Sequence, residues 1–136
     1  MKQYIYVLLP FISWLIAGST KFLVNSLRFK GEGFKRIGNG GFPSTHTTIV
    51  TSVVMFLGLQ WGFFTPYFLL AITFFLITII DAMGIRRTVG RHAQILNSIS
   101  KNDKKLRTLQ GHKPYEVLGG IILGIIIGLF FYYILL

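Results

Sequence analysis

Residues 117–136 are twenty consecutive residues without a charged side chain, and they constrain the fold more than any other stretch. An α-helix rises about 1.5 Å per residue, so about 20 apolar residues are enough to cross the hydrocarbon core of a bilayer. The 136-residue chain as a whole is also apolar, since 52% of its residues are hydrophobic and only 13% are charged. Soluble domains carry about 25% charged residues. The sequence therefore predicts a membrane protein.

Three further apolar runs, at residues 4–17, 47–64 and 67–80, have the composition of membrane-spanning segments. The first run follows Lys2 and precedes small residues, as in a signal peptide, but the remaining chain is itself apolar, so we interpret this run as a retained span. We predict an all-α integral membrane helical bundle of about four transmembrane helices, in one domain over residues 1–136. The chain has no cysteine, which excludes disulfides and thiolate metal sites.

The net charge of +10 comes from residues 21–42 and 85–114, which hold all but one of the fourteen Lys and Arg residues. Within them, residues 21–29 and 85–99 have apolar side chains at helical spacing, so we expect one or two amphipathic helices on the membrane surface. Four spans place both basic stretches on one side, and the positive-inside rule makes that side cytoplasmic in the cell membrane. Cations that belong to a binding site would weaken this orientation argument.

Three glycines repeat every four residues in the last apolar run: Gly120, Gly124 and Gly128. This spacing puts them on one face of a helix, where the absence of side chains lets a second helix approach closely. That helix could belong to the same bundle, which we favour, or to the partner in a homodimer. A chain of this size could also use a homodimer to shield a site.

Pro43-Ser44-Thr45-His46 follows a glycine-rich segment and begins the second predicted span. The free N–H groups and positive dipole end of such a helix start favour an anion such as phosphate, and a histidine there can exchange a proton near neutral pH. The four-span topology brings more ionisable side chains to the same membrane face: Lys21, Arg28, Asp81, His112 and Glu116. Ionisable groups near the membrane are costly and usually have a task, so we predict a functional site at this face.

Residues 112–120 begin with a histidine, followed by a proline two residues later and a glutamate four residues later. This pattern resembles the third signature of the type 2 phosphatidic acid phosphatase superfamily, which includes bacterial acid phosphatases and vanadium haloperoxidases. Residues 43–46 resemble its second signature, Pro-Ser-Gly-His, and the pair Lys21 and Arg28 resembles its first. The three elements follow the family order, and the short chain looks like the small divergent membrane branch of that superfamily.

The resemblance implies a phosphatase in which His112 is the nucleophile, Glu116 orients its ring and His46 protonates the leaving oxygen. It implies a phosphohistidine intermediate that water hydrolyses without a metal ion or another cofactor. The residue types suit this chemistry, because phosphoryl transfer needs a nucleophile, an acid for the leaving group and donors around the phosphoryl oxygens. The phosphate-binding set would be Lys21, Arg28, Ser44, Thr45 and either Arg86 or Arg87.

The sequence departs from the family pattern in all three signatures. Phe29 stands where the first has proline, Thr45 replaces the glycine of the second, and Glu116 replaces the aspartate of the third. Simpler roles also stay open for one residue of the second signature and one of the third. Glu116 could be only a favourable acid in the first turn of a helix, and Ser44 could be only a helix cap.

The arginine that the third signature has six residues before its histidine is also displaced, since Leu106 occupies that position. We favour Arg86 or Arg87 as its replacement, with Arg107 as the alternative. Arg86 also precedes His92 by six residues, but Leu96 stands where the orienting acid would be. We therefore interpret His92 as a polar residue of a surface helix.

Asp81 is expected at the C-terminus of the third span, where the helix dipole disfavours an acid, so it should pair with a cation. This pairing would orient a site cation, and it is favoured over a metal site. Lys21 and Arg28 could alternatively be interface cations whose stems lie along the apolar surface. The expected partners of Asp81 are Arg86, Arg87 and Lys21.

Two functions fit the sequence. The first is a membrane phosphatase acting from the cytoplasmic leaflet on phosphatidate, a phosphatidylglycerophosphate or an isoprenoid phosphate. The second is a non-enzymatic protein that binds anionic lipid headgroups or a membrane partner through the same pocket. The expected partners are the bilayer and a lipid phosphate, and no nucleic acid is expected.

Overall fold

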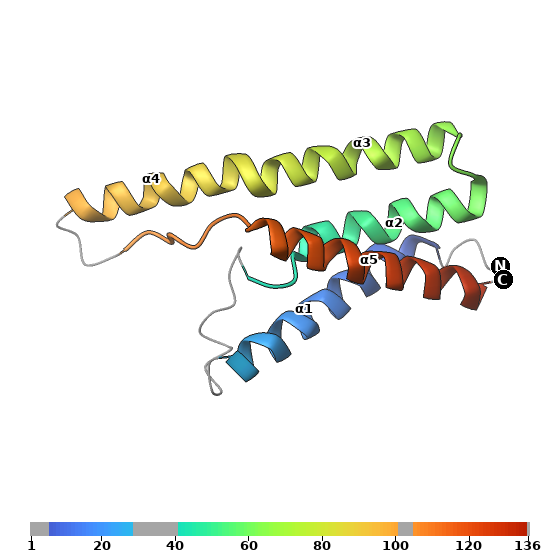
Figure 1. The fold of residues 1–136 in the computed structure, drawn as a ribbon, viewed down its shortest axis with the longest axis horizontal. Helices are drawn as coiled ribbons and strands as arrows, with labels where there is room; N and C mark the ends of the chain where they lie inside the picture. Colours follow the sequence, from blue (N-terminus) through green and yellow to red (C-terminus); the bar gives the residue numbers. More distant parts are fainter. Residues whose placement is uncertain (1–5, 29–40, 101–104, 136) are drawn as a thin grey trace.

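The computed structural model describes residues 6–28, 41–100 and 105–135, which form five α-helices and one π-helix and contain no strand in these ranges. In chain order these elements are α1 (Leu9–Arg28), α2 (Thr45–Trp61), α3 (Pro66–Ile80), η3 (Asp81–Ile85), α4 (Arg86–Ile99) and α5 (Pro114–Leu135), as shown in Figure 1. The prediction of an all-α membrane bundle is confirmed.

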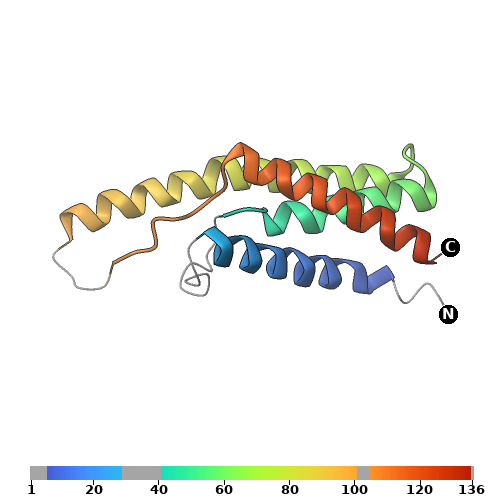
Figure 2. The same ribbon diagram turned by 60° about the horizontal axis from the view of Figure 1, so that its bottom comes forward.

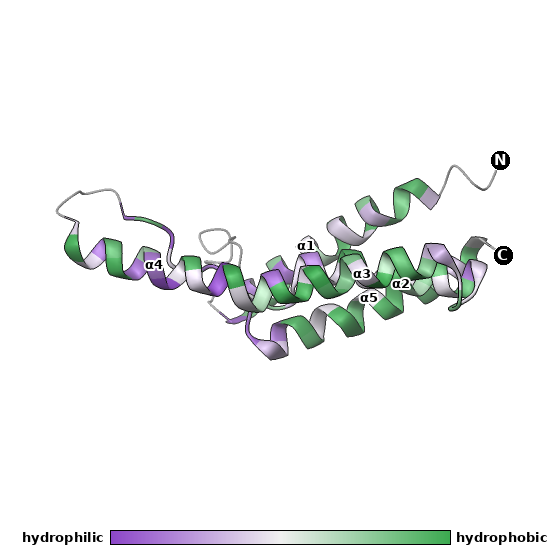
Figure 3. Ribbon diagram, turned by 90° about the horizontal axis from the view of Figure 1, so that it is seen from above, coloured by the Kyte–Doolittle hydropathy of each residue, from purple (hydrophilic) through white to green (hydrophobic). Residues whose placement is uncertain are grey.

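Three helical segments are long and apolar enough to cross a membrane: Tyr6–Arg28, Pro66–Ile99 and Pro114–Ile134. The remaining expected span, residues 47–64, corresponds to α2. Its 17 residues are at the lower limit of about 17–25 residues for a spanning helix. Helix α2 lies at the centre of the bundle, in contact with α1, α3 and α5. Figure 3 shows that apolar residues dominate these helices, while hydrophilic residues gather around the starts of α4 and α5.

The close packing of α2 against α5 depends on the three glycines spaced four apart. A Cβ atom added at Gly120, Gly124 or Gly128 would lie 2.7 Å from a carbonyl oxygen of α2 or its cap residue. These carbonyls belong to successive turns, at Ser44, Thr48 and Ser52. The glycine face is therefore occupied within the bundle, as favoured from the sequence.

Both ends of the bundle are fixed by specific contacts. Ser44 caps α2 by accepting from the Thr47 N–H at 3.4 Å, which confirms its role as a cap. The hydroxyls of Ser13 in α1 and Ser52 in α2 are hydrogen-bonded at 2.7 Å. At the far end, a buried apolar cluster joins three helices through Leu9, Phe56, Ile127 and Phe131.

The helix that begins at Pro66 continues to Ile99 without a break, through the π-helix η3. Its 34 residues correspond to about 51 Å, which exceeds the roughly 30 Å of bilayer hydrocarbon. Figures 1 and 2 show α4 projecting beyond the rest of the bundle. Helix α3 ends at Ile80, as expected for the third span, but the helix itself does not terminate at Asp81, because a π turn there carries it onward into α4.

The two amphipathic stretches are helical, but neither is a separate surface helix. Residues 21–28 are the last turns of α1, which runs to Arg28 instead of ending near residue 17. Residues 86–99 are α4. The segment that runs back from the end of α4 is held against it where the Leu106 N–H donates to the Asn97 side chain at 2.7 Å. The part of the first stretch beyond Arg28, including Phe29, lies outside the described residues.

Candidate active site

His112 and Glu116 form a buried pair at the start of α5. The two side chains are joined through His112 Nδ1 and Glu116 Oε2 at 3.2 Å, and His112 is only 1% exposed. The same carboxylate oxygen accepts from the Lys113 backbone N–H at 2.9 Å. Since a carboxylate only accepts, this contact assigns the Nδ1–H tautomer to a neutral His112, with the lone pair on Nε2. The expected spacing of one helical turn thus produces the expected contact.

Two backbone hydrogen bonds attach this pair to the rest of the site. The His112 N–H donates to the Ala82 carbonyl in η3 at 2.9 Å, and the Ser44 N–H donates to the Glu116 carbonyl at 2.9 Å. The first bond joins the histidine to the long helix, and the second joins α2 to α5. Segments about 30 and 70 residues apart in sequence are therefore fixed to one another by main-chain contacts.

Gly111 makes the approach to η3 sterically feasible. Its φ of +77° lies in the left-handed region that disfavours side chains. A Cβ atom at this position would lie 2.7 Å from the Arg87 backbone nitrogen and 3.0 Å from the Ala82 carbonyl oxygen. The loop before His112 can therefore dock on the π turn only with a glycine here.

Lys21 lies on the buried face of α1 and is 7% exposed. Buried residues occur every four positions along this helix: Leu9, Ser13, Ala17, Lys21 and Asn25. Lys21 thus points into the bundle instead of lying at the interface as a cation with an exposed head. Its charge acts on His112, where burial first and Lys21 second hold the pKa of the imidazole below its ordinary value of 6.5. The hydrogen bond and negative charge of Glu116 act in the opposite direction.

Arg28 is not brought to the same place. It is exposed at the last residue of α1, about 10 Å along the helix axis from Lys21. The first-signature pair is therefore divided in the described structure: Lys21 faces the buried pair, and Arg28 lies at the exposed end of the helix.

His46 occupies the first turn of α2, where its side chain is exposed. The charged groups that act on its ring are Arg86, Lys21 and Asp81. Asp81 accepts from Arg86 Nε in an ion pair, with the two side chains 32% and 31% exposed. The expected pairing of Asp81 with a cation is confirmed, and its partner is Arg86.

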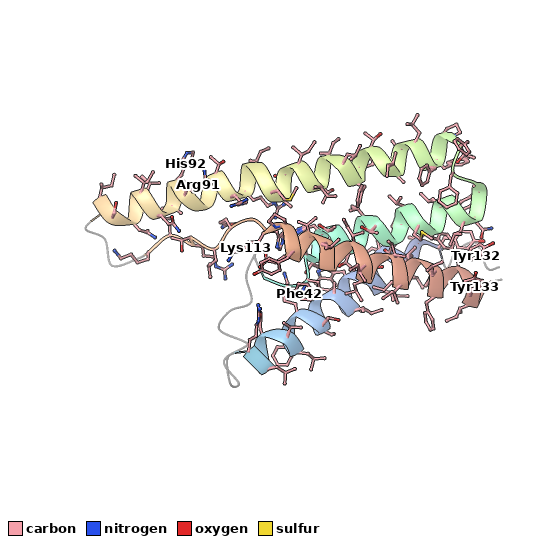
Figure 4. All side chains as sticks on the ribbon, viewed as in Figure 1. Phe42, Arg91, His92, Lys113, Tyr132 and Tyr133 are labelled. Carbon is pink, nitrogen blue, oxygen red and sulfur yellow. The ribbon has the colours of Figure 1, made fainter. Side chains whose placement is uncertain are left out.

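A small cavity of about 170 Å³ lies beside the buried pair. Its walls include His112 and Glu116, together with the cationic side chains of Arg87 and Lys113. Arg86 therefore faces Asp81 and His46, whereas Arg87 lies at the cavity. Arg107 is exposed, and Figure 4 shows His92 out on the projecting part of α4, away from Lys113 at the start of α5. The interpretation of His92 as a surface-helix residue agrees with this exposure.

A larger groove of about 610 Å³ lies along α1, and we call it the α1 groove. It has mainly apolar walls, and it reaches the site at Lys21 and Thr45. Its lining residues are Trp14, Leu15, Gly18, Ser19, Lys21, Phe22, Leu23 and Thr45.

Two features of the site were not predicted from the sequence. Asn25 is buried next to Lys21, with its Oδ1 atom 3.9 Å from where a Cβ of Gly41 would lie. The available signal was its spacing of four residues from Lys21 on one helix face. The Ala82 carbonyl, which holds the His112 backbone, carries no side-chain signal at all. Among the described residues, no three His, Asp or Glu side chains gather closely enough to hold a metal ion.

Comparisons with known proteins place the chain in a family. Residues 3–127 match the family described as "Divergent PAP2 family". The chain is 31% identical over 115 residues to a Bacillus subtilis (strain 168) protein named "Uncharacterized membrane protein YuiD", covering 68% of this chain and 73% of that protein. No solved structure matches the chain. The family match covers most of the sequence and includes all three signature segments, so this membrane protein belongs to the divergent PAP2 family.

Proposed function

We propose that the protein is a membrane phosphatase that hydrolyses a lipid phosphate monoester at the face where α2 and α5 begin. The observation that carries the proposal is the buried contact of His112 Nδ1 with Glu116 Oε2 at 3.2 Å, which leaves Nε2 as the ring nitrogen that can attack. Around this pair lie two cationic donors, Lys21 and Arg87, and a second histidine, His46, that can carry a proton. A phosphate needs such cations, and a phosphoryl transfer needs such a nucleophile.

The reaction follows from these positions. Nε2 of His112 attacks phosphorus, a P–N bond forms, and the P–O bond to the lipid breaks while His46 gives its proton to the leaving oxygen. Water then attacks the phosphohistidine, His46 takes a proton from it, and inorganic phosphate leaves as the P–N bond breaks. Glu116 stabilises the positive imidazole in both steps. Lys21, Thr45 and Arg87 hold the phosphoryl oxygens, while Asp81 keeps Arg86 oriented beside His46. Ser44 serves as the cap of α2, because its hydroxyl is bonded to Thr47 and its N–H to the Glu116 carbonyl.

The membrane location supports a lipid substrate, because the site lies at the end of a bundle of apolar helices. Phosphatidate, phosphatidylglycerophosphate and isoprenoid phosphates all place a phosphate at that depth. The concentration of Lys and Arg in residues 21–42 and 85–114 favours the cytoplasmic side of the cell membrane for this face.

The test is phosphate release by purified protein in lipid nanodiscs over a panel of these lipid phosphates. We expect turnover that vanadate inhibits, a strong loss in His46→Ala, and unchanged turnover in His92→Ala, which removes an exposed histidine away from the site. Lack of turnover on every substrate, or turnover that His46→Ala leaves intact, would contradict the proposal.

The exposed position of Arg28 favours a second candidate, a phosphatase fold that binds anionic headgroups without hydrolysis. One of the cations of the first signature is then absent from the phosphate site. This candidate predicts that the protein binds inorganic phosphate or vanadate, that Lys21→Met weakens the binding, and that no substrate is turned over.

The depressed pKa of His112 gives a testable titration. Burial and the charge of Lys21 favour the neutral imidazole, so its midpoint should lie below 6.5 and the nucleophile should stay neutral at pH 7. Lys21→Met removes the positive neighbour, so we expect the midpoint to rise. The measurement is a nitrogen NMR titration of the imidazole in nanodiscs, with Lys105→Met, an exposed cation, as the control. A midpoint at or above 6.5, or one that Lys21→Met leaves unchanged, would contradict the assignment.

A further inference from the structure

The α1 groove adjoins the proposed phosphate site without being part of the catalytic machinery. Lys21 and Thr45 line its inner end, and both are also in the proposed phosphate-binding set. From Lys21 the groove runs along α1 to Trp14, seven residues or about 10 Å toward the N-terminus of the helix. It therefore leads from the phosphate position toward the interior of the membrane.

The walls of this groove are apolar and turned outward. Trp14, Leu15 and Leu23 are 57%, 58% and 60% exposed, so none of them is used to pack the bundle. Their exposure is ordinary for a lipid-facing helix. The distinguishing feature is the continuity of these side chains with a buried lysine and with the start of α2.

We propose that the α1 groove binds the hydrocarbon chain of the substrate, and that Gly18 sets the space available for it. This inference rests on the proposed function, since it takes the phosphate to lie at Lys21 and Thr45. The occupant is one alkyl, acyl or prenyl chain attached to that phosphate. A chain held there positions the scissile P–O bond against the site, so the groove acts on the reacting geometry as well as on binding.

Gly18 provides the opening. A Cβ atom added at this position would meet no atom within 4 Å, although the residue lies in the middle of α1. Close helix packing therefore does not explain a glycine here, and glycine is unfavourable in a helix interior relative to alanine. A small residue at this position keeps the middle of the groove clear between Trp14 and Phe22.

The first test fills the groove with Gly18→Leu. The open space around the position means that the helix can accept the new side chain, and Gly84→Leu is the matched control because a Cβ at Gly84 also meets nothing within 4 Å. In nanodiscs, we expect Gly18→Leu to lower kcat/KM for a long-chain lipid phosphate by at least about tenfold, the scale of steric selection in an apolar pocket. Turnover of p-nitrophenyl phosphate, which has no hydrocarbon chain, should stay within about twofold of the wild-type value in Gly18→Leu.

The second test does not depend on turnover. A long-chain alkyl phosphate with a diazirine in its tail is photolysed in nanodiscs with the wild-type protein, and the labelled residues are mapped by mass spectrometry. We expect labelling of residues 14–23 that vanadate suppresses and that Gly18→Leu reduces. The matching alcohol probe, which lacks the phosphate, should label α1 and α3 alike and should not respond to vanadate.

The outcomes separate this inference from the proposed function. The role of the groove would be overturned if Gly18→Leu lowered turnover equally for the long-chain lipid phosphate and p-nitrophenyl phosphate, or lowered neither. The proposed phosphatase activity would be unaffected by that result. Labelling that is independent of headgroup and vanadate would also overturn the role of the groove, because the groove would then hold ordinary bilayer lipid. Phosphate-dependent labelling without any turnover would support the groove and contradict only the hydrolysis.

Discussion

Replacing His112 with asparagine should lower the turnover of every phosphate ester by at least about a thousandfold, because the nucleophile itself is removed. Asparagine keeps an N–H group that can donate to Glu116, and it keeps the backbone bond to Ala82. The loss should therefore be in kcat, with the protein still folded. Phosphate release in nanodiscs measures it, and size-exclusion profiles with thermal unfolding check the fold.

The comparison with His46→Ala separates the roles of the two histidines. If His46 supplies the proton to the leaving oxygen, its loss should matter much less for p-nitrophenyl phosphate, whose leaving group needs no proton, than for a lipid phosphate. The loss in His112→Asn should be equally severe on both substrates. A folded His112→Asn protein with near wild-type turnover would remove the covalent role from His112. A His46→Ala loss that is equal on both substrates would remove the acid role from His46.

Gly124→Leu should be the most destabilising single substitution in the bundle core. A Cβ atom there would lie 2.5 Å from the Thr51 Cβ and 2.7 Å from the Thr48 carbonyl, and both contacts are to groups that cannot move without shifting α2. Overpacking of a core costs about 1–3 kcal/mol even when side chains can adjust, so a backbone clash should exceed that range. We expect a large fall in the thermal midpoint in nanodiscs and poor recovery of folded protein.

Gly18→Leu is the control, because it makes the same chemical change in a helix where the new side chain meets open space. It should leave the thermal midpoint unchanged or slightly raised, since leucine is a better helix former than glycine. Equal melting of Gly124→Leu and wild type would show that α2 and α5 are not packed along the glycine face. The result would also reopen the homodimer contact that the sequence allowed.

Local patterns predicted most of the fold and two side-chain contacts of the candidate site. Twenty uncharged residues at 117–136 predicted α5, and the four-residue repeat of Gly120, Gly124 and Gly128 predicted its packing face. The contact of His112 with Glu116 was predictable because one helical turn separates them. The pairing of Asp81 with a cation was predicted from a helix C-terminus at this position, and it occurs although the helix continues.

The remaining features depend on tertiary structure, which short-range patterns do not encode. Asp81 to Gly84 reads as the end of a helix, but the docking of His112 on Ala82 occurs at a π turn in a helix that continues. Arg28 has the family spacing from Lys21, yet α1 extends to this residue and leaves it exposed at its end. Asn25 gave no chemical signal, because an amide becomes informative only once it is known to be buried.

The docking of α5 on α2 joins helices that are made at different times during synthesis. Helix α2 turns Thr47 and Thr51 toward Gly120 and Gly124 of α5, and both threonines are buried in the finished protein. The nascent chain makes α2 long before residue 112, so these hydroxyls lack their glycine-faced neighbour while α3 and α4 are being made. Glu116 and the glycines arrive together on the last helix. The insertion of one segment therefore both covers the polar face of α2 and completes the candidate site, so a ribosome-bound chain that ends before α5 has neither.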